Sequence, residues 1–246
     1  MHPILCQIGT FTIYSYGAMV AVAVVVCTFL LQHDARRKHW DPNVMVDLVF
    51  WVSVAGIIGS RLFFIILHVH YFLQHPLEVF YLHQGGLAWQ GGLILSTVVG
   101  VLFIRYHKLP LLKTLDFVIP YAALGQSLGR IGCFFNGCCH GKPWGQGMYF
   151  PVHQQTLHPT QLYSAINLFL IFVILKIGQA RHVVEGRIFC WYFILASFER
   201  LIVQFFRADY EPIILGLGIF QLINVAMIFL AFYADIYLLH RARRRA

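Results

Sequence analysis

Seven long apolar runs are the feature that most constrains what this chain can fold into. Each run is close to the ~20 residues that an α-helix needs to cross a bilayer. The runs lie at about Ile13–Leu31, Val46–His68, Leu87–Arg105, Phe117–Phe135, Gln161–Ile177, Ile188–Phe206 and Ile214–Leu239. The sequence therefore predicts an all-α, polytopic integral membrane protein with about seven transmembrane helices. No linker or repeat interrupts the pattern, so a single transmembrane domain is expected over residues 1–246.

Composition supports the same class. Of the 246 residues, 59% are hydrophobic and 11% are charged, and the mean hydropathy is +0.70. Soluble domains average about 25% charged residues, which excludes an ordinary soluble fold. The net charge of +8 would by itself allow a nucleic-acid partner, but the positions of the basic residues indicate a different explanation.

Basic residues gather in alternate loops. Cytoplasmic loops of membrane proteins carry an excess of Lys and Arg. The rich segments contain Arg36, Arg37, Lys38, Arg105, Lys108, Lys113, Lys176, Arg181, Arg187, Arg241, Arg243, Arg244 and Arg245, whereas the other loops contain only Lys142 and Arg207. This alternation predicts an external N-terminus, a cytoplasmic C-terminus and no nucleic-acid partner.

Arg61, Arg130 and Arg200 are the remaining basic residues, and each lies inside an apolar run. A charged side chain at the bilayer centre costs about 2.5–3.5 kcal/mol or more, so such residues usually mark functional sites. All three fall past the midpoint of runs directed outward, which predicts one shared depth in the outer half of the membrane. Too few carboxylates lie near to pair with them. The pattern therefore favours an anionic ligand, most simply a phospholipid headgroup, over structural ion pairs.

The segment from Gly129 to Gly141 contains Arg130 and four glycines, and it is rich in thiols. A planar guanidinium in a glycine-lined site is suited to binding two phosphate oxygens. Its other candidate ligands are Cys133, Cys138, Cys139 and His140. Zinc sites usually draw on separated cysteine pairs, and the adjacent Cys138 and Cys139 are not expected to reach one ion. A disulfide, with Cys6 as another external candidate, is about as good an interpretation. We predict no metal site and no cofactor.

A second polar segment, from His158 to Tyr163, opens the fifth run. Pro159 and Thr160 are typical of a helix start, with Thr160 as the expected cap. That interpretation leaves His158, Gln161 and Tyr163 at the level predicted for the arginines. The loop 137–158 is expected to cover the site, and the loop 69–85 is expected to contain an amphipathic piece on the outer surface.

These motifs together resemble one family, the phosphatidylglycerol–prolipoprotein diacylglyceryl transferases. The similarity covers most of the chain. It is carried by Tyr16-Gly17, Gly59-Ser60-Arg61, Gln90-Gly91-Gly92-Leu93-Ile94, Gly129-Arg130-Ile131-Gly132, the segment from His158 to Tyr163 and the segment from Glu199 to Arg207. The resemblance implies seven spans in the bacterial cytoplasmic (inner) membrane, with the active site toward the outer leaflet.

The resemblance also implies a reaction. Family members move the diacylglyceryl group of phosphatidylglycerol to the lipobox cysteine thiol of a preprolipoprotein signal peptide, forming a thioether and releasing glycerol phosphate. On this similarity, Arg130 and Arg200 are expected to bind the phosphate and stabilise the leaving group. The remaining residues expected at the phosphatidylglycerol site are Arg61, Arg207, Tyr16, Gln90, Asn136, Gly141, Gln161 and Tyr163.

The chain departs from the family pattern at several positions. Family members usually have His at the position of Gln90, Asn at that of Cys133 and an acidic residue at that of Cys138. A glutamine cannot act as a general base near neutral pH, so His140 and His158 become the candidates for that role. Alternatively, the acceptor thiol ionises in the field of the arginines. Two other functions stay open: a divergent transferase with another acceptor, and a non-catalytic protein that binds or translocates phospholipid.

Overall fold

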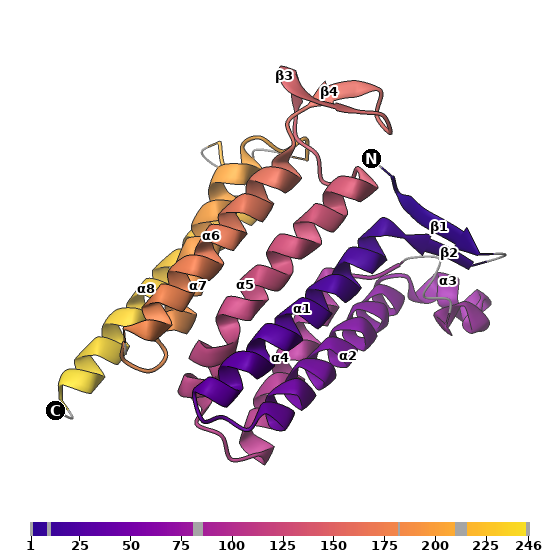
Figure 1. Cartoon of the computed structure of the whole chain (residues 1–246). Helices are drawn as coiled ribbons and strands as arrows, with labels where there is room; N and C mark the ends of the chain where they lie inside the picture. The colour runs from indigo at the N-terminus through magenta and orange to yellow at the C-terminus, as the bar shows by residue number, and fades with distance from the viewer. Residues whose placement is uncertain (1, 9–10, 81–85, 182, 210–215, 245–246) are drawn as a thin grey trace. The chain divides into compact units, whose positions relative to one another are not determined.

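The computed structural model describes residues 2–8, 11–80, 86–181, 183–209 and 216–244. Long helices dominate it (Figure 1). Each predicted run overlaps one of them: α1 Ser15–Arg37, α2 Pro42–Leu67, α4 Trp89–Tyr106, α5 Leu111–Asn136, α6 Thr160–Ala180, α7 Arg187–Gln204 and α8 Ile219–Arg243. The predicted start of the last run, Ile214, lies outside the described residues.

Five of the described helices are long and apolar enough to cross a membrane, namely α1, α2, α4, α6 and α8. A helical membrane protein is therefore confirmed at that level. Helix α5 carries Arg130, and α7 carries Glu199 and Arg200, which makes both more polar. Seven spans and the orientation of the termini stay predictions.

Short elements that the all-α prediction did not contain precede α1 and connect later helices. Strands β1 (Ile4–Ile8) and β2 (Phe11–Tyr14) pair antiparallel, as do β3 (Pro143–Phe150) and β4 (Gln155–Leu157). The run Phe11–Tyr14 consists of residues that favour strands, so helix α1 begins only at Ser15. Between α2 and α4 lie helix α3 (Val69–Gln74) and the 3₁₀ helix η1 (Pro76–Phe80), where an amphipathic piece was expected. The end of that predicted segment, residues 81–85, is outside the described part of the chain.

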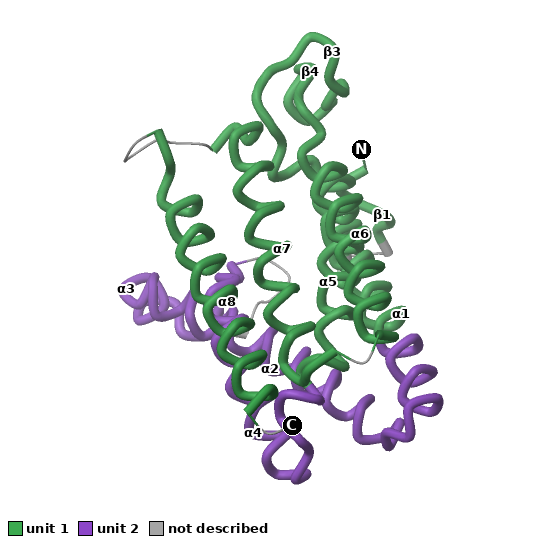
Figure 2. The backbone as a smooth tube through the Cα atoms, turned by 90° about the vertical axis from the view of Figure 1, so that its left-hand side faces the viewer, with its two compact units in different colours: residues 1–27, 115–246 green, residues 28–114 purple. Residues whose placement is uncertain are grey.

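The chain separates into two compact units, residues 1–27 with 115–246 and residues 28–114 (Figure 2). The prediction of a single domain stays a prediction. In the first unit, α6 packs on α7 and α7 on α8. The core between α5, α6 and α7 is built from Ala123, Leu168, Ile171, Leu175, Ile188 and Tyr192.

Polar contacts align the helices of the first unit. The carboxylate of Asp116 on α5 accepts hydrogen bonds from the backbone N–H groups of Gly186 and Phe189, at 2.5 and 2.8 Å. These N–H groups belong to the first turn of α7, where no carbonyl is available to them. Arg187 on α7 donates two hydrogen bonds to Asp235 on α8, at 2.7 and 3.0 Å. Both contacts fix the direction in which α7 leaves the loop.

In the second unit, α2 and α4 approach to backbone contact. A Cβ placed on Gly59 would meet the carbonyl oxygen of Gly91 and lie 2.6 Å from Leu95 Cβ. A Cβ on Gly92 would lie 2.9 Å from the carbonyl oxygen of Gly56. Small residues that permit such contact are typical of helix pairs in membranes. The Gly-Ser-Arg and Gln-Gly-Gly segments are therefore packing motifs as well as family motifs.

Candidate active site

The loop that follows α5 is held by side chains from the start of α6. Gln161 donates from Nε2 to the carbonyl of Cys138 at 2.6 Å, and Thr160 donates from Oγ1 to the carbonyl of Cys139 at 2.8 Å. The prediction that Thr160 caps α6 is wrong, because its hydroxyl is used by this loop and the N-cap residue is Pro159. Both Thr160 and Gln161 are buried. They therefore position the loop instead of facing solvent.

Backbone hydrogen bonds tie the same loop to the segment beyond α7. Gly141 N–H donates to the carbonyl of His158 at 2.9 Å, and Lys142 N–H donates to the carbonyl of Phe206 at 2.8 Å. Ala208 N–H donates to the carbonyl of His140 at 3.3 Å. Gly141 also forms an isolated β-bridge with Arg207. The arrangement brings three segments together that are far apart in the sequence.

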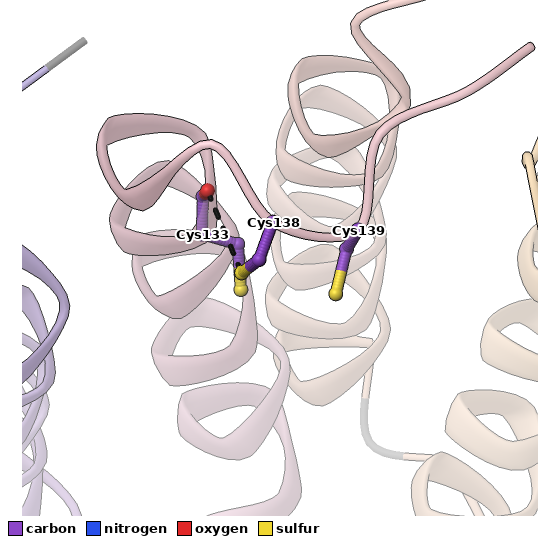
Figure 3. Close-up of side chains that lie close together, drawn as sticks. All are labelled: Cys133, Cys138 and Cys139. Atoms are coloured by element: carbon purple, nitrogen blue, oxygen red, sulfur yellow. Dashed lines mark hydrogen bonds between the residues drawn. The ribbon is translucent and has the colours of Figure 1, made fainter. Parts of the chain in front are cut away.

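Three thiols meet at the end of α5 (Figure 3). The Sγ atoms of Cys133, Cys138 and Cys139 all lie within 4.8 Å of one another. All six cysteines of the chain are free thiols, and these three are half-buried. Cys138 and Cys139 were not expected to reach one ion, and the structure places their Sγ atoms close to each other and to that of Cys133. Cys139 adopts a left-handed backbone conformation with φ of 60°, which turns the chain so that neighbouring side chains converge.

Electrostatics favours the thiolate form of one of the three thiols, Cys139. Hydrogen bonds from Cys133 and Cys138 hold the pKa of the Cys139 thiol well below its usual range, and the guanidinium groups of Arg207 and Arg130 act in the same direction. Asn136 also hydrogen-bonds the Cys138 thiol. The cluster is thus adjacent to two of the arginines that the sequence singles out.

The guanidinium groups of Arg130 and Arg207 both act on that of Arg200, so these three cations lie near one another. Glu199 is 7% exposed and interacts electrostatically with all three. Nevertheless, Glu199 Oε1 and Arg200 Nη1 are buried without a hydrogen-bond partner among the described residues. A buried unpaired polar group costs about 1–3 kcal/mol, more if it is charged. An anionic ligand with several acceptor oxygens would satisfy the Arg200 donor.

Arg207 has a carboxylate partner that sequence reasoning missed. Its Nε and Nη2 atoms donate to the two carboxylate oxygens of Asp209, at 2.7 and 2.6 Å. This bidentate hydrogen bonding by Arg207 lowers the pKa of the Asp209 carboxyl from its usual value. The sequence offered one signal for this ion pair, because only one residue separates Arg207 from Asp209. Arg207 is thereby oriented, and it retains further N–H donors.

Tyr16 belongs to the same neighbourhood. It lies in the first turn of α1 and interacts electrostatically with Cys133, Cys138 and Arg130. Close packing of α1 on α5 places it there, because a Cβ on Gly132 would lie 2.9 Å from Met19 Cβ and 3.4 Å from Tyr16 Cδ2. A phenol hydroxyl is therefore available beside the arginines and the thiols.

The two candidate histidines have different surroundings. The ring of His158 stacks on Trp144 with centroids 4.4 Å apart, and its Nδ1 lies 3.3 Å from the Tyr163 hydroxyl. The ring of His140 lies 4.1 Å from that of His153. Beside His158 is an apolar cavity of about 530 Å³. It is lined by Trp144, His158, Tyr163, Ile166, Asn167, Ile202, Val203 and Phe206.

Arg61 and Gln90 belong to the second compact unit. The guanidinium of Arg61 donates to the carbonyls of Glu78, Val79 and Gly86, at 2.5, 3.0 and 3.1 Å. It therefore holds the connection between α2 and α4. Gln90 is exposed in the first turn of α4. The structure thus brings together Tyr16, Arg130, Asn136, Gly141, Gln161, Arg200 and Arg207 within the first unit, and it places His140, His158 and Tyr163 on the adjoining segments.

Apolar helices and a group of arginines, of which Arg207 is buried and Arg130 and Arg200 are half-buried, define a helical membrane protein with a cationic site. Over residues 3–237 the chain matches the family described as prolipoprotein diacylglyceryl transferase. The chain belongs to this family.

Similar bacterial proteins support the assignment over nearly the whole length. A phosphatidylglycerol–prolipoprotein diacylglyceryl transferase of Clostridium tetani is 30% identical over an alignment of 241 residues, which covers 95% of this chain and 96% of the relative. A protein of the same name from Synechocystis is 33% identical over 247 residues, covering 93% of this chain and 86% of the relative. One from Staphylococcus saprophyticus is 30% identical over 240 residues, covering 93% and 86%.

Proposed function

We propose that this chain transfers the diacylglyceryl group of phosphatidylglycerol to the lipobox cysteine thiol of a preprolipoprotein. Family membership and the names of the similar proteins support the reaction. The structural observation that carries the proposal is the group formed by Arg130, Arg200 and Arg207, in which a buried guanidinium donor of Arg200 has no partner among the described residues. A phosphodiester supplies acceptor oxygens of the right charge for such a group.

The arginines suit the charge changes of this reaction. The acceptor sulfur attacks the glyceryl carbon next to the phosphate, the C–O bond breaks, and glycerol phosphate leaves with the electron pair. Negative charge therefore grows on the departing phosphate. Fixed donors directed at developing charge lower the barrier, and one such donor is worth about 10²–10³ in rate. We assign this role to Arg130 and Arg200, with Arg207 and Tyr16 binding the headgroup.

The apolar cavity beside His158 suits an extended hydrophobic group. Its volume of about 530 Å³ lies within the roughly 300–1,000 Å³ of ordinary ligand sites. An acyl chain or the apolar part of the signal peptide has the required chemistry. In this proposal Tyr163 and His158 form its polar edge, while Asn136, Gly141 and Gln161 hold the neighbouring loop in place.

We further propose seven transmembrane helices, namely the five most apolar helices together with α5 and α7. The N-terminus would be external, the C-terminus cytoplasmic, and the site would face the outer leaflet of the bacterial inner membrane. Support comes from the alternation of Lys and Arg between loops. A contact of Arg61 with the headgroup stays a prediction, and we expect no nucleic-acid partner.

The residues present limit which groups can assist ionisation of the acceptor thiol. Gln90 cannot accept a proton near neutral pH, so we propose that His140, His158 or the field of the arginines assists thiol ionisation. As a prediction, Gln90→His should be tolerated or should raise activity, because the side chain is exposed in the first turn of α4 and the larger ring needs no repacking. Transfer kinetics at several pH values would measure this. A severe loss would show that the surroundings of residue 90 have been rebuilt.

The decisive experiment uses purified protein in phosphatidylglycerol-containing micelles with a lipobox-cysteine peptide. Glycerol phosphate release and the mass of the peptide are followed together. We expect a diacylglyceryl mass increase, and a loss on the order of 10²-fold or more in Arg130→Ala. The matched control is Arg181→Ala, because Arg181 is exposed at the end of α6. Near-normal transfer by Arg130→Ala would overturn the site. Bound phosphatidylglycerol without transfer would instead indicate a lipid-binding protein or another acceptor.

A further inference from the structure

The cluster of Cys133, Cys138 and Cys139 has the dimensions of a metal site. A zinc–sulfur bond is about 2.3 Å long, so two thiolates on one tetrahedral ion lie about 3.8 Å apart. The three Sγ atoms already lie within 4.8 Å of one another. The Sγ atoms would have to approach one another by at most about 1 Å to reach the spacing of a tetrahedral zinc site.

The loop that carries two of these thiols is built to hold them. Its carbonyls at Cys138 and Cys139 receive hydrogen bonds from the buried side chains of Gln161 and Thr160. Cys139 occupies a left-handed conformation, which costs a residue other than glycine on the order of 1–3 kcal/mol and is retained mainly at functional sites. Ordinary packing cysteines are small buried hydrophobes, as Cys27 and Cys190 are here. The three clustered thiols are only half-buried, so core packing does not explain them.

We propose that Cys133, Cys138 and Cys139 bind one Zn²⁺ ion through their sulfur atoms, and that the fourth coordination position takes the acceptor cysteine thiol. The second part rests on the proposed function. Among the described residues, no fourth His, Cys, Asp or Glu ligand atom belongs to the group. Three protein ligands with one open position are typical of catalytic zinc, whereas structural sites have four.

The surrounding charges suit such a centre. Three thiolates and Zn²⁺ leave one net negative charge, and Arg130 and Arg207 interact electrostatically with Cys139. Arg130 and Cys133 are three positions apart on α5 and so face the same side of the helix. A thiolate bound to the ion would therefore lie beside the guanidinium group of Arg130, which is assigned to the leaving phosphate.

A bound zinc ion would also activate the acceptor cysteine thiol. A thiol coordinated to zinc is deprotonated, so its proton passes to solvent and the thiolate remains bound to the metal. The sulfur then forms a bond to the glyceryl carbon while the C–O bond to phosphate breaks. The glycerol phosphate leaves as an anion, and the neutral thioether, a weaker ligand, dissociates from the ion. No side-chain base is consumed in this sequence.

Metal binding is tested independently of activity. The full-length protein is purified in micelles, loaded with Zn²⁺ and analysed for metal content, with Co²⁺ as a spectroscopic substitute. We expect one ion per chain and a sulfur-to-cobalt charge-transfer band. Both should be lost in Cys138→Ser and Cys139→Ser and retained in the control Cys6→Ser, because Cys6 is exposed and outside the cluster.

A measurement on the unchanged protein covers the case in which a variant does not fold. Zn²⁺ should protect Cys133, Cys138 and Cys139 from alkylation, as read by peptide mass spectrometry, while Cys6 still reacts. Absence of stoichiometric zinc, unchanged alkylation in its presence, or a disulfide within the cluster under zinc-loading conditions would each overturn the proposal.

The role of the fourth position is tested with two peptides. A lipobox-cysteine peptide should strengthen the charge-transfer band of the cobalt-loaded protein, and the matched serine peptide should not. Zinc removal should lower transfer at least tenfold without loss of bound phosphatidylglycerol. Full transfer by zinc-free protein would refute this inference and leave the proposed function intact. Zinc and peptide binding without any transfer would instead refute the proposed function and leave the metal site.

Discussion

Replacing Gly141 with alanine tests whether close backbone contacts hold the loop after α5. An added Cβ would lie 2.5 Å from His158 Cβ, 2.5 Å from the carbonyl oxygen of Phe206 and 2.9 Å from Thr160 Cγ2. Non-bonded carbon atoms pack at about 3.5–4.0 Å, so the segments must separate by roughly 1 Å. The nearest atoms are a backbone oxygen and a Cβ, which cannot rotate away.

The expected magnitudes follow from that displacement. Overpacking of this kind costs about 1–3 kcal/mol. Each kcal/mol lowers Tm by about 2–4 °C in a protein of this size. Misplacement of reacting groups by about 1 Å costs on the order of 10² in rate, and this loop carries Cys138 and Cys139 next to Arg207. We therefore expect Gly141→Ala to lower transfer far more than it lowers stability.

Thermal unfolding in micelles and transfer to the cysteine peptide are measured on the same preparations. The control is Gly145→Ala, because a Cβ on Gly145 meets no atom within 4 Å and the residue lies only four positions further along the chain. The control should match the unchanged protein in both assays. If Gly141→Ala behaves like the control in both, the close contacts do not position the loop, and the reasoning fails.

Two further predictions concern packing and pH. Gly59→Ala should destabilise the protein by about 1–3 kcal/mol, because the added Cβ collides with α4. The control is Gly56→Ala on the same helix, which should be neutral because its Cβ meets no atom within 4 Å. Thermal unfolding of both variants measures the difference. Arg207 lowers the pKa of Asp209, so its stabilisation is present above the ordinary Asp pKa of about 3.9 and is lost as pH falls through the lower folded-state value. Asp209→Asn should therefore flatten the stability curve below about pH 4, and melting curves that keep the original slope would contradict the pairing.

Sequence patterns predicted the helices well, because burial of about 20 apolar residues is a local, additive property. The same patterns misplaced the start of α1. Phe11–Tyr14 is as apolar as a helix start, yet it forms strand β2, and hydropathy does not distinguish an apolar strand from an apolar helix. The arginines could be singled out for a similar local reason. An ionised group inside an apolar membrane segment is costly whatever the tertiary structure is.

The partners of those polar groups could not be predicted in this way. Thr160 was expected to cap its own helix, but its hydroxyl reaches the carbonyl of Cys139 from a distance of 21 residues. Arg61 donates to the carbonyls of residues 78, 79 and 86, which are contacts that the sequence did not indicate. Each choice depends on which unpaired backbone groups the chain path brings near, and local composition does not contain that information.

The sequence by itself determined that the chain is a helical membrane protein of this family with arginines inside its apolar segments. Only the tertiary structure decided that Cys133, Cys138 and Cys139 converge beside those arginines. The physical reason is that convergence depends on one left-handed residue, on Gly141 and on hydrogen bonds from Thr160 and Gln161. The free energy of moving an apolar residue out of water depends on that residue alone. Hydrogen bonds and close contacts between distant segments, in contrast, exist only in the folded structure.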